Sequence, residues 1–264
     1  FKMSDLSLMG LIEIIPKIPM LISRIKLTAN SIISQNPDVL ITIDSPDFCM
    51  RVAKKVRNAL PNLKIIHYVA PSVWAWRPER AAKMSKYVDH VLALLPFEPP
   101  YMEAEGMTCD FVGHPAVSSP HVSKKAQEKF KKKYNLHNGP IITVLPGSRI
   151  GEIKRMCPIF NKVLNNIEKL YPDSQFILPV ASSVEKDVVN AVKSWNIKPL
   201  LLLNEGKDLK ELEHDKFITY SISSAALATS GTVSLELAAK KCPMIVAYKA
   251  NWITTKMVKK LAKI

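Results

Sequence analysis

The chain has 264 residues, 47% of them hydrophobic, and carries a formal net charge of +14 at pH 7. This length and apolar content allow a large buried core and two domains, which excludes an intrinsically disordered protein. The four cysteines lie far apart without a C-x-x-C pair, so neither a zinc site nor a disulfide framework is predicted, and we expect a reducing compartment. The positive charge indicates an anionic partner, which could be a phosphorylated substrate, a membrane surface or nucleic acid.

The segment from Leu6 to Ile25 is dense in Leu, Ile and Met but is interrupted by charged residues and prolines. A spanning helix needs about 20 mostly apolar residues, so this segment is not predicted to cross a bilayer. Its apolar residues are too many for a narrow core stripe, which leaves two interpretations open. The segment could be a buried helix of the core, or an interfacial segment in which acyl chains would contact Met9, Ile12, Ile15 and Leu21.

Strands and helices alternate in the first half of the chain. A parallel sheet covered by helices on both faces is therefore predicted, with ligands at the carboxyl ends of the strands. The expected strands are 39–43, 64–69, 90–94 and the short 111–112, and the expected helices are about 48–60 and 79–87.

Two loops follow strands of this sheet and face the same edge. Asp44 ends the first strand, where a carboxylate can accept a proton from a substrate hydroxyl, although Asp44 could also be a simple turn residue. Asp47 is expected to be the N-cap of the next helix. Ser72 and Trp76 lie in the loop P-S-V-W-A-W-R, whose two indoles could stack on sugar faces or pack beneath the loop.

A polar stretch that contains Pro120 follows His114 and is predicted to be a linker between two domains. The expected boundaries are 1–115 for the first domain, 116–123 for the linker and 124–264 for the second domain. A lone histidine is more often structural than functional, so His114 gains a role only if the linker forms the hinge of a cleft.

The second half repeats the alternation and again predicts a parallel α/β sheet. Two of its turns carry residues suited to phosphate groups. The expected strands are 141–145, 175–180, 200–203, 225–228 and 244–248, and the expected helices are 124–134, 153–170, 184–195 and one that ends at 241.

The first of these turns begins at Pro146-Gly147, after which Ser148, Arg149 and Gly151 precede a helix. Such a turn points the first amides of the helix at whatever lies over the sheet edge, and Arg149 adds a fork-shaped positive charge. The pattern therefore indicates a place for a phosphate. The alternative is an ordinary strand-to-helix turn whose arginine lies in solvent.

The second turn contains Ser230, Gly231 and Thr232 at the start of a helix, with Glu236 one turn further along the same face as Thr232. Hydroxyls, amides and a carboxylate could meet one ligand there, although a plain capping box is the alternative. Two such turns, with an acid to hold ribose hydroxyls, favour a nucleotide diphosphate as the ligand.

Six runs of residues closely resemble the lipid-A-disaccharide synthases, in order and at the spacing of that family, over nearly the whole chain. The run P-S-V-W-A-W-R is the most specific. The family extends upstream of Phe1 and beyond Ile264, so we expect a fragment that lacks both ends. The six runs are I-D-S-P-D-F (43–48), H-Y-V-A-P-S-V-W-A-W-R (67–77), L-P-F-E (95–98), F-V-G-H-P (111–115), L-P-G-S-R-I-G-E (145–152) and S-G-T-V-S-L-E (230–236).

The resemblance implies a GT-B fold, in which two Rossmann-like parallel-sheet domains face a cleft, with the N-terminal domain incomplete. It implies an inverting, metal-independent glycosyltransferase of lipid A biosynthesis that moves 2,3-diacylglucosamine from UDP to 2,3-diacylglucosamine 1-phosphate. The expected partners are these substrates and a membrane surface, with a homodimer for the complete protein, no nucleic acid and no cofactor. The expected location is the cytoplasmic face of the bacterial inner membrane, with peripheral attachment.

The resemblance also assigns roles to residues of this sequence. Asp44 matches the first Asp of the family's D-x-P-D-F and would act on the acceptor hydroxyl, while Arg149 would stabilise the charge on departing UDP. No metal is expected, because the sequence has no D-x-D. Substrate binding would involve Ser72, Trp76, His114, Ser148, Gly151, Glu152, Ser230, Gly231, Thr232 and Glu236.

The lipid substrates would give the last segment a purpose as well, because Trp252 to Ile264 surrounds an apolar stripe with lysines, as membrane-surface helices do. Its alternative is a lysine-rimmed helix packed on the second domain. Two other functions remain open for the chain, an inactive membrane-associated remnant and a UDP-sugar epimerase of the same fold. A nucleic-acid module is disfavoured, because the lysines are scattered and no recognition motif accompanies them.

Overall fold

The structure is a computed structural model that describes residues 15–75, 77–118 and 121–249. The chain forms two compact units, the first ending at His114 and the second beginning at Pro115. Each unit has its own parallel sheet and its own buried core. The predicted α/β fold with parallel sheets is therefore confirmed.

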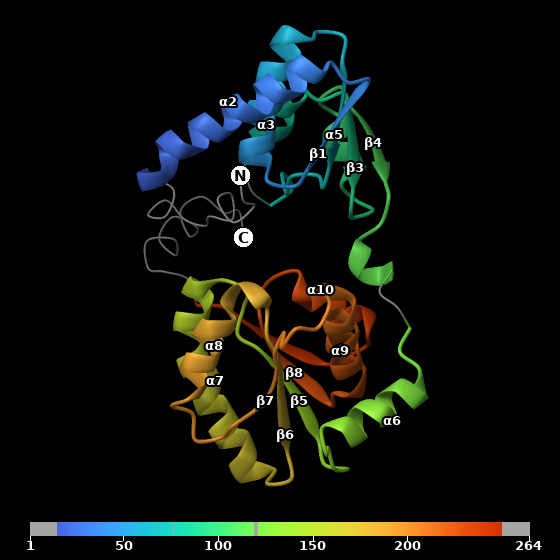
Figure 1. The fold of residues 1–264 in the computed structure, drawn as a ribbon. Coiled ribbons are helices and arrows are strands. Elements are labelled where there is room, and N and C mark those ends of the chain that lie inside the picture. Colours follow the sequence, from blue (N-terminus) through green and yellow to red (C-terminus); the bar gives the residue numbers. More distant parts are fainter. Residues whose placement is uncertain (1–14, 76, 119–120, 250–264) are drawn as a thin grey trace. The chain divides into compact units, whose positions relative to one another are not determined.

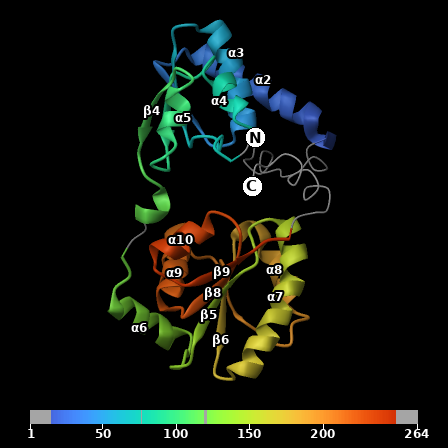
Figure 2. The ribbon, with the colours of Figure 1, turned by 180° about the vertical axis from the view of Figure 1, so that it is seen from behind.

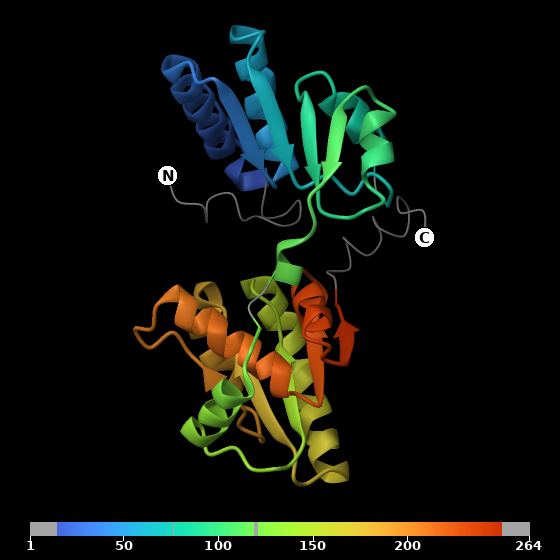
Figure 3. The ribbon, with the colours of Figure 1, turned by 90° about the vertical axis from the view of Figure 1, so that its right-hand side faces the viewer.

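The first unit is built on a four-stranded parallel sheet in the order β1-β2-β3-β4 (Figure 1). Figure 3 shows these strands side by side, with their carboxyl ends at one edge. The strands are β1 (Val39–Ile43), β2 (Lys64–Tyr68), β3 (His90–Ala93) and β4 (Thr108–Phe111). The helices are the 3₁₀-helix η2 (Ile15–Lys17), α2 (Ile18–Gln35), α3 (Pro46–Ala59), α4 (Glu79–Met84) and α5 (Pro99–Glu103).

The helices of the first unit cover one face of its sheet. The strand order follows the chain order, so right-handed crossovers bring α3, α4 and α5 to the same side. Residues of these helices share one buried core with Ile65 and Val91 of the sheet. On the opposite face, Ile41 and Ile43 are 54% and 64% exposed. The predicted cover on both faces is therefore wrong for the described part of this unit.

Helix α2 packs on α3 through only part of its apolar stripe. Ile25 and Ala29 are buried, whereas Ile18 and Ile22, which continue the stripe toward the start of the helix, are exposed. In Figures 1 and 2 the beginning of α2 extends beyond the rest of its unit. Within the described residues, no helix is both long enough and apolar enough to cross a bilayer.

The second unit is a doubly wound sheet in the order β7-β6-β5-β8-β9, with all strands parallel. Figure 2 shows α7 and α8 on one side of this sheet and α6 and α9 on the other. The strands are β5 (Ile141–Leu145), β6 (Gln175–Pro179), β7 (Leu200–Leu202), β8 (Ala225–Thr229) and β9 (Met244–Ala247). The helices are η3 (Pro115–Ser118), α6 (Lys124–Lys133), α7 (Ile150–Leu170), η4 (Ser182–Val184), α8 (Glu185–Val192), α9 (Leu209–Ile222) and α10 (Val233–Ala239).

The stretch predicted as a linker, 116–123, differs from that expectation where the structure describes it. Residues of η3 contact α10, and Ala116 is buried. Val122 belongs to the buried core that α6 and α9 share with the sheet. Burial of these two apolar side chains ties much of the stretch to the second unit.

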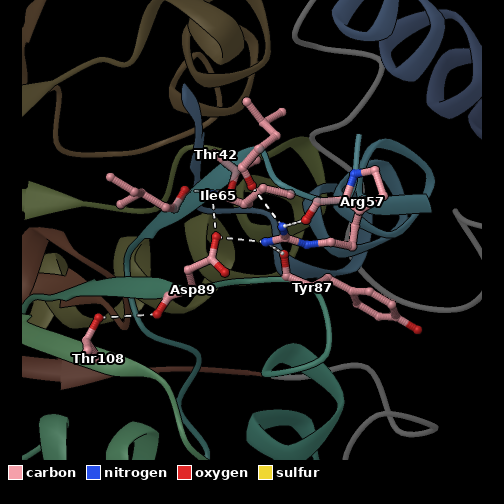
Figure 4. Close-up of polar contacts among 9 residues, drawn as sticks. Thr42, Arg57, Ile65, Tyr87, Asp89 and Thr108 are labelled. Atoms are coloured by element: carbon pink, nitrogen blue, oxygen red, sulfur yellow. Dashed lines mark hydrogen bonds and ion pairs between the residues drawn. The ribbon is translucent and has the colours of Figure 1, made fainter. Parts of the chain in front are cut away.

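Arg57 holds three segments of the first unit together at the amino-terminal side of the sheet (Figure 4). Its Nη1 donates to the carbonyls of Pro61 and Leu63 at 2.7 and 2.8 Å, and its Nη2 donates to the carbonyl of Tyr87 at 3.2 Å. Nη2 also lies 2.7 Å from Oδ2 of Asp89, which accepts a further bond from the Ile65 amide at 2.8 Å. Burial alone would raise the pKa of Asp89, but the Ile65 amide and the Arg57 guanidinium outweigh it and lower the pKa.

Replacing Arg57 by Met keeps the apolar stem and removes the four hydrogen bonds. We expect the free energy of unfolding of the first unit to fall by about 2–3 kcal/mol at pH 7, measured by urea denaturation. Because the folded pKa of Asp89 is lowered, its contribution is present above the unfolded pKa and is lost as pH falls through the folded value. The difference between wild type and variant should therefore shrink below about pH 4.

The matched control is Arg51→Met, which removes an exposed arginine from the same helix. An equal loss of stability in both variants would contradict the role assigned to Arg57.

Candidate functional site

A pocket opens at the carboxyl ends of β1 and β2 in the first unit. Its volume is about 260 Å³, and its polar lining consists of Asp44, Ser72 and Arg80. Pro46 and Pro71 contribute apolar walls. A carboxylate, a hydroxyl and a guanidinium therefore share one small space, which suits a ligand that carries hydroxyl groups.

The backbone around this pocket is held in conformations that non-glycine residues rarely adopt. Asp44 and Ser45 have φ values of 51° and 43°, and the β-branched Val69 has a φ of 82°. Such conformations cost about 1–3 kcal/mol each and cluster at functional sites. Hydrogen bonds of the sheet hold them in place, because the Asp44 amide donates to the Tyr68 carbonyl at 2.9 Å and the Val69 amide to the Leu92 carbonyl at 3.0 Å.

The charge of Asp44 acts on two buried groups nearby. His67 is fully buried, and its Nδ1 lies 2.8 Å from Oγ1 of Thr42. Burial lowers the pKa of His67 to about 4, although the charge of Asp44 acts in the opposite direction. Burial raises the pKa of the Cys49 thiol to about 11, and the charge of Asp44 adds to the rise. Both groups are therefore neutral neighbours of Asp44 at pH 7.

Arg80 is a lining residue that the sequence reasoning missed. Its Nη2 lies 3.0 Å from Oδ2 of Asp47, across the mouth of the loop that begins α3. The predicted N-cap role of Asp47 is wrong, because α3 already begins at Pro46 and its N-cap residue is Ser45. The sequence signal that could have found Arg80 is the W-A-W-R run, because Arg80 lies three residues after its end.

The other predicted residues of the first unit have different outcomes. Ser72 lines the pocket, and Trp74 packs edge-on against Phe97 with ring centroids 5.3 Å apart. His114 is half-buried at the end of the unit. Ile15 is exposed and Leu21 is half-buried, and Met9, Ile12, Trp76 and the segment 252–264 lie outside the described residues.

In the second unit, the two predicted phosphate turns follow neighbouring strands. β5 pairs with β8, and the strand order reverses between them. The chain leaves β5 toward α7, which packs on one face, and leaves β8 toward α10, which packs on the other. In open α/β sheets, ligands bind outside the carboxyl ends of the strands at such a switch point. Both turns therefore lie at the edge where a ligand is expected.

The turn after β5 depends on Gly147 and Glu152. Gly147 has a φ of 123°, and a Cβ there would lie 2.5 Å from Oε2 of Glu152. Glu152 is only 6% exposed, and its Oε2 accepts a hydrogen bond from the Ser148 amide at 3.0 Å. Its Oε1 lies 2.9 Å from Nη1 of Arg149. The carboxylate that we predicted to bind substrate is thus engaged within the turn, and Arg149 forms an ion pair instead of standing free.

The start of α7 nevertheless keeps backbone donors for a ligand. The helix begins at Ile150, with Arg149 as its N-cap residue in an extended conformation. The first amides of an α-helix have no acceptor within the helix, and those of α7 include Ile150 and Gly151. Gly151 therefore lies where we predicted, in the first turn at the carboxyl edge of β5.

The turn after β8 is open to solvent. Ser230, Gly231 and Thr232 are all exposed, and a Cβ on Gly231 would meet no atom within 4 Å. The Ser230 amide donates to the Ala247 carbonyl on β9 at 3.1 Å, so this amide is occupied. The hydroxyls of Ser230 and Thr232 remain candidates for ligand contacts.

Glu236 lies one turn into α10 and is held from α9. Its Oε1 lies 3.1 Å from Nζ of Lys216, and it also forms a side-chain hydrogen bond with Tyr220. Burial first, and then the nearby Glu236, raise the pKa of Tyr220 well above its usual value. A ribose hydroxyl would therefore have to share a carboxylate that already has two partners.

The edge formed by these two turns is suited to an anion with several oxygens. Helix-start amides and positive partial charge favour phosphate groups, and the two hydroxyls add further donors. In the described ranges, no group of three or more His, Cys, Asp or Glu side chains is arranged to hold a metal ion.

Comparison with known proteins shows the family to which the chain belongs. The sequence model described as lipid-A-disaccharide synthetase matches residues 1–264. The chain belongs to the lipid-A-disaccharide synthetase family. The lipid-A-disaccharide synthase of Ruegeria pomeroyi is 46% identical over 264 residues, which are 100% of this chain and 66% of that protein. The enzyme of the same name from Rhodospirillum centenum is 41% identical and covers 100% of this chain, which spans 64% of its length.

Solved structures share the fold of this family member at low identity. The complex of Staphylococcus aureus MnaA with UDP has a TM-score of 0.64 at 16% identity, covering 88% of this chain and 64% of that one. The UDP-GlcNAc 2-epimerase of Neisseria meningitidis bound to UDP-GlcNAc has a TM-score of 0.57 at 13% identity, with coverages of 90% and 67%. These likenesses support the two-sheet fold.

The two glycines of the phosphate turns should respond differently to a methyl group. Gly147→Ala would place Cβ 2.5 Å from Oε2 of Glu152 and force a strained φ, so we expect a loss of about 1–3 kcal/mol in the free energy of unfolding. Gly231→Ala meets open space, so its unfolding free energy should change by less than about 0.5 kcal/mol.

Both changes in unfolding free energy are measured from the unfolding transition of the second unit, in thermal and in urea denaturation. A Gly147→Ala protein as stable as Gly231→Ala would contradict the structure of the turn after β5.

Proposed function

We propose that the full-length protein is a lipid-A-disaccharide synthase, which transfers 2,3-diacylglucosamine from UDP to the 6-hydroxyl of 2,3-diacylglucosamine 1-phosphate. The observation that carries this proposal is the family match over residues 1–264, which includes both sites. The sites offer what the transfer needs, namely a carboxylate beside a pocket in one unit and an anion-binding edge in the other. A UDP-sugar epimerase is the weaker candidate, because its support comes only from structures of low identity.

Asp44 is the proposed base of the reaction. The acceptor hydroxyl gives its proton to Asp44 as its oxygen attacks the anomeric carbon of the donor, and the bond from that carbon to the diphosphate oxygen breaks. Attack from the face opposite to the leaving group inverts the anomeric centre. The strained backbone at Asp44 supports this role, because it fixes the direction of the Cα–Cβ bond that carries the carboxylate, beside the pocket, before a substrate binds.

Binding of UDP is assigned to the second unit. The amides at the start of α7, together with Arg149, would stabilise the negative charge that grows on the departing diphosphate. The hydroxyls of Ser230 and Thr232 would add hydrogen bonds, and Glu236 would hold the ribose. In this proposal the first domain binds the acceptor and the second domain binds the donor. The acceptor would contact Ser72, Trp76 and His114.

Replacing Asp44 by Asn keeps the shape of the side chain and removes the base. In the full-length protein, we expect kcat to fall by about 10²- to 10⁴-fold while the affinity for UDP changes by less than about twofold. Turnover is followed as UDP released from UDP-2,3-diacylglucosamine in the presence of the acylated acceptor, with unacylated sugars as the comparison.

The matched control is Asp110→Asn, which removes an exposed carboxylate at the end of β4 in the same sheet. Near-normal turnover by Asp44→Asn would remove Asp44 from the mechanism.

We further propose peripheral attachment to an anionic membrane surface, at the cytoplasmic face of the inner membrane. Support comes from the exposed apolar side chains of Ile15 in η2 and of Ile18 and Ile22 at the start of α2, and from the net charge of +14. Leu21 is half-buried and contributes less exposed surface than its neighbours. From the family resemblance, we also propose that the complete protein forms a homodimer.

Co-sedimentation with vesicles that contain anionic lipid should capture the full-length protein at low salt and release it at high salt. The double variant Ile18→Ser with Ile22→Ser should bind more weakly, because it loses exposed apolar surface. Leu27→Ser is the control, since Leu27 is an exposed apolar residue on another face of α2. An absence of sedimentation at low salt, or an equal loss in the control, would end the assignment to α2.

A further inference from the structure

The charges at the start of α7 do not all remain available to a ligand. Nη1 of Arg149 lies 2.9 Å from Oε1 of the buried Glu152, and the pair has no net charge. A diphosphate that approaches this turn therefore meets an arginine whose charge is already offset. A second cation close to the same amides would give the turn a net positive charge.

Arg155 is such a cation. It lies on α7 one turn after Gly151, and side chains of a helix lean toward its amino end, which brings the guanidinium back over the first turn. A Cβ placed on Gly151 would lie 3.2 Å from Nη1 and 3.4 Å from Nη2 of Arg155. The absence of a side chain at Gly151 makes the room that this guanidinium uses.

Among the residues that the structure describes, the contacts of Arg155 leave most of its N–H donors available and do not offset its charge. Its Nε donates to the carbonyl of Lys249 at 2.9 Å. Within the described part of the chain, no carboxylate forms an ion pair with Arg155. A neutral carbonyl fixes the direction of the guanidinium without offsetting its charge.

The strand order fixes where this guanidinium lies. α7 follows β5, Lys249 follows β9, and β8 lies between those two strands in the sheet. A side chain that reaches from the first turn of α7 to Lys249 therefore passes the carboxyl end of β8, where the Ser230 turn begins. Arg155 therefore extends from the turn after β5 toward the carboxyl end of β8 and contacts the segment after β9.

An unused hydroxyl lies at the same end of β8. Thr229 is 3% exposed, and within the described residues its Oγ1 has no hydrogen-bond partner. Leu227 packs in the core shared with α7, so Thr229, two residues further on, projects from the same face of the strand. A buried hydroxyl without a partner costs free energy that a bound ligand can recover.

We propose that Arg155 binds the diphosphate of the nucleotide, with its Nη groups donating to phosphate oxygens, and that the Thr229 hydroxyl adds a neighbouring contact. This proposal rests on the proposed function, because it names a further binding residue of the same donor site. Arg149 then acts mainly through the turn that it shapes with Glu152, and Arg155 supplies the uncompensated positive charge.

The test measures the affinities of UDP, UMP and uridine for the full-length protein by titration calorimetry. Arg155→Gln should weaken UDP binding by about 10- to 100-fold and leave uridine binding within about twofold, because only the phosphates lose a partner. Arg155→Lys should recover part of the loss. Lys154→Gln is the matched control, since it removes an exposed cation from the neighbouring position of the same helix.

A second variant keeps the test decisive if loss of the Lys249 contact unfolds Arg155→Gln. Thr229→Val removes the unpartnered hydroxyl, so the protein should stay as stable as wild type while UDP binds several-fold more weakly. UDP binding within twofold of wild type in both variants, or equal losses for UDP and uridine, would overturn the proposal. A wild-type protein that binds no UDP would instead overturn the proposed function itself.

Discussion

The proposed donor-side site depends on one buried carboxylate, that of Glu152. A charge with 6% exposure must be paired, and Glu152 meets this need with the Ser148 amide and the Arg149 guanidinium. Both partners belong to the turn that joins β5 to α7, so satisfying the carboxylate also fixes the turn. The positive φ of Gly147 is the backbone condition for this arrangement, and its result is that the first amides of α7 face the sheet edge.

The sequence predicted regular elements best where local signals agree. The strands 39–43 and 141–145 match the structure residue for residue, because β-branched runs end at clear breakers. Helix α9 was missed, since its buried residues include the consecutive Phe217, Ile218, Thr219 and Tyr220 and show no amphipathic period, although Asp208 caps it through the Glu211 amide. The uncovered face of the first sheet was also missed. The alternation of strands and helices predicts which elements form, but it does not predict the order of the strands in the sheet, which decides the face that each helix covers.

The sequence predicted where the candidate residues lie in the fold, but it did not predict which side chains they contact. The turns after β5 and β8 lie on paired strands, as parallel strands require, yet Glu152 and Glu236 are engaged with Arg149 and Lys216. The Glu152 pair follows from helical spacing at i and i+3, whereas Lys216 comes from α9, which the sequence reasoning did not find. The position of Arg80 in the pocket lining likewise depends on the path of a loop, which the composition of the sequence does not specify.

Separate units solve an electrostatic conflict in the proposed reaction. The reaction needs a carboxylate to accept a proton and amide donors to receive a diphosphate, but a carboxylate close to free amides binds them itself. Glu152 does so with the Ser148 amide at 3.0 Å. A base within the same turn would compete with the phosphate for those donors and would repel it. Asp44, the proposed base, belongs to the other sheet instead, where its charge acts on His67 and Cys49 and where no hydrogen bond to an amide of the turn after β5 is needed to hold it.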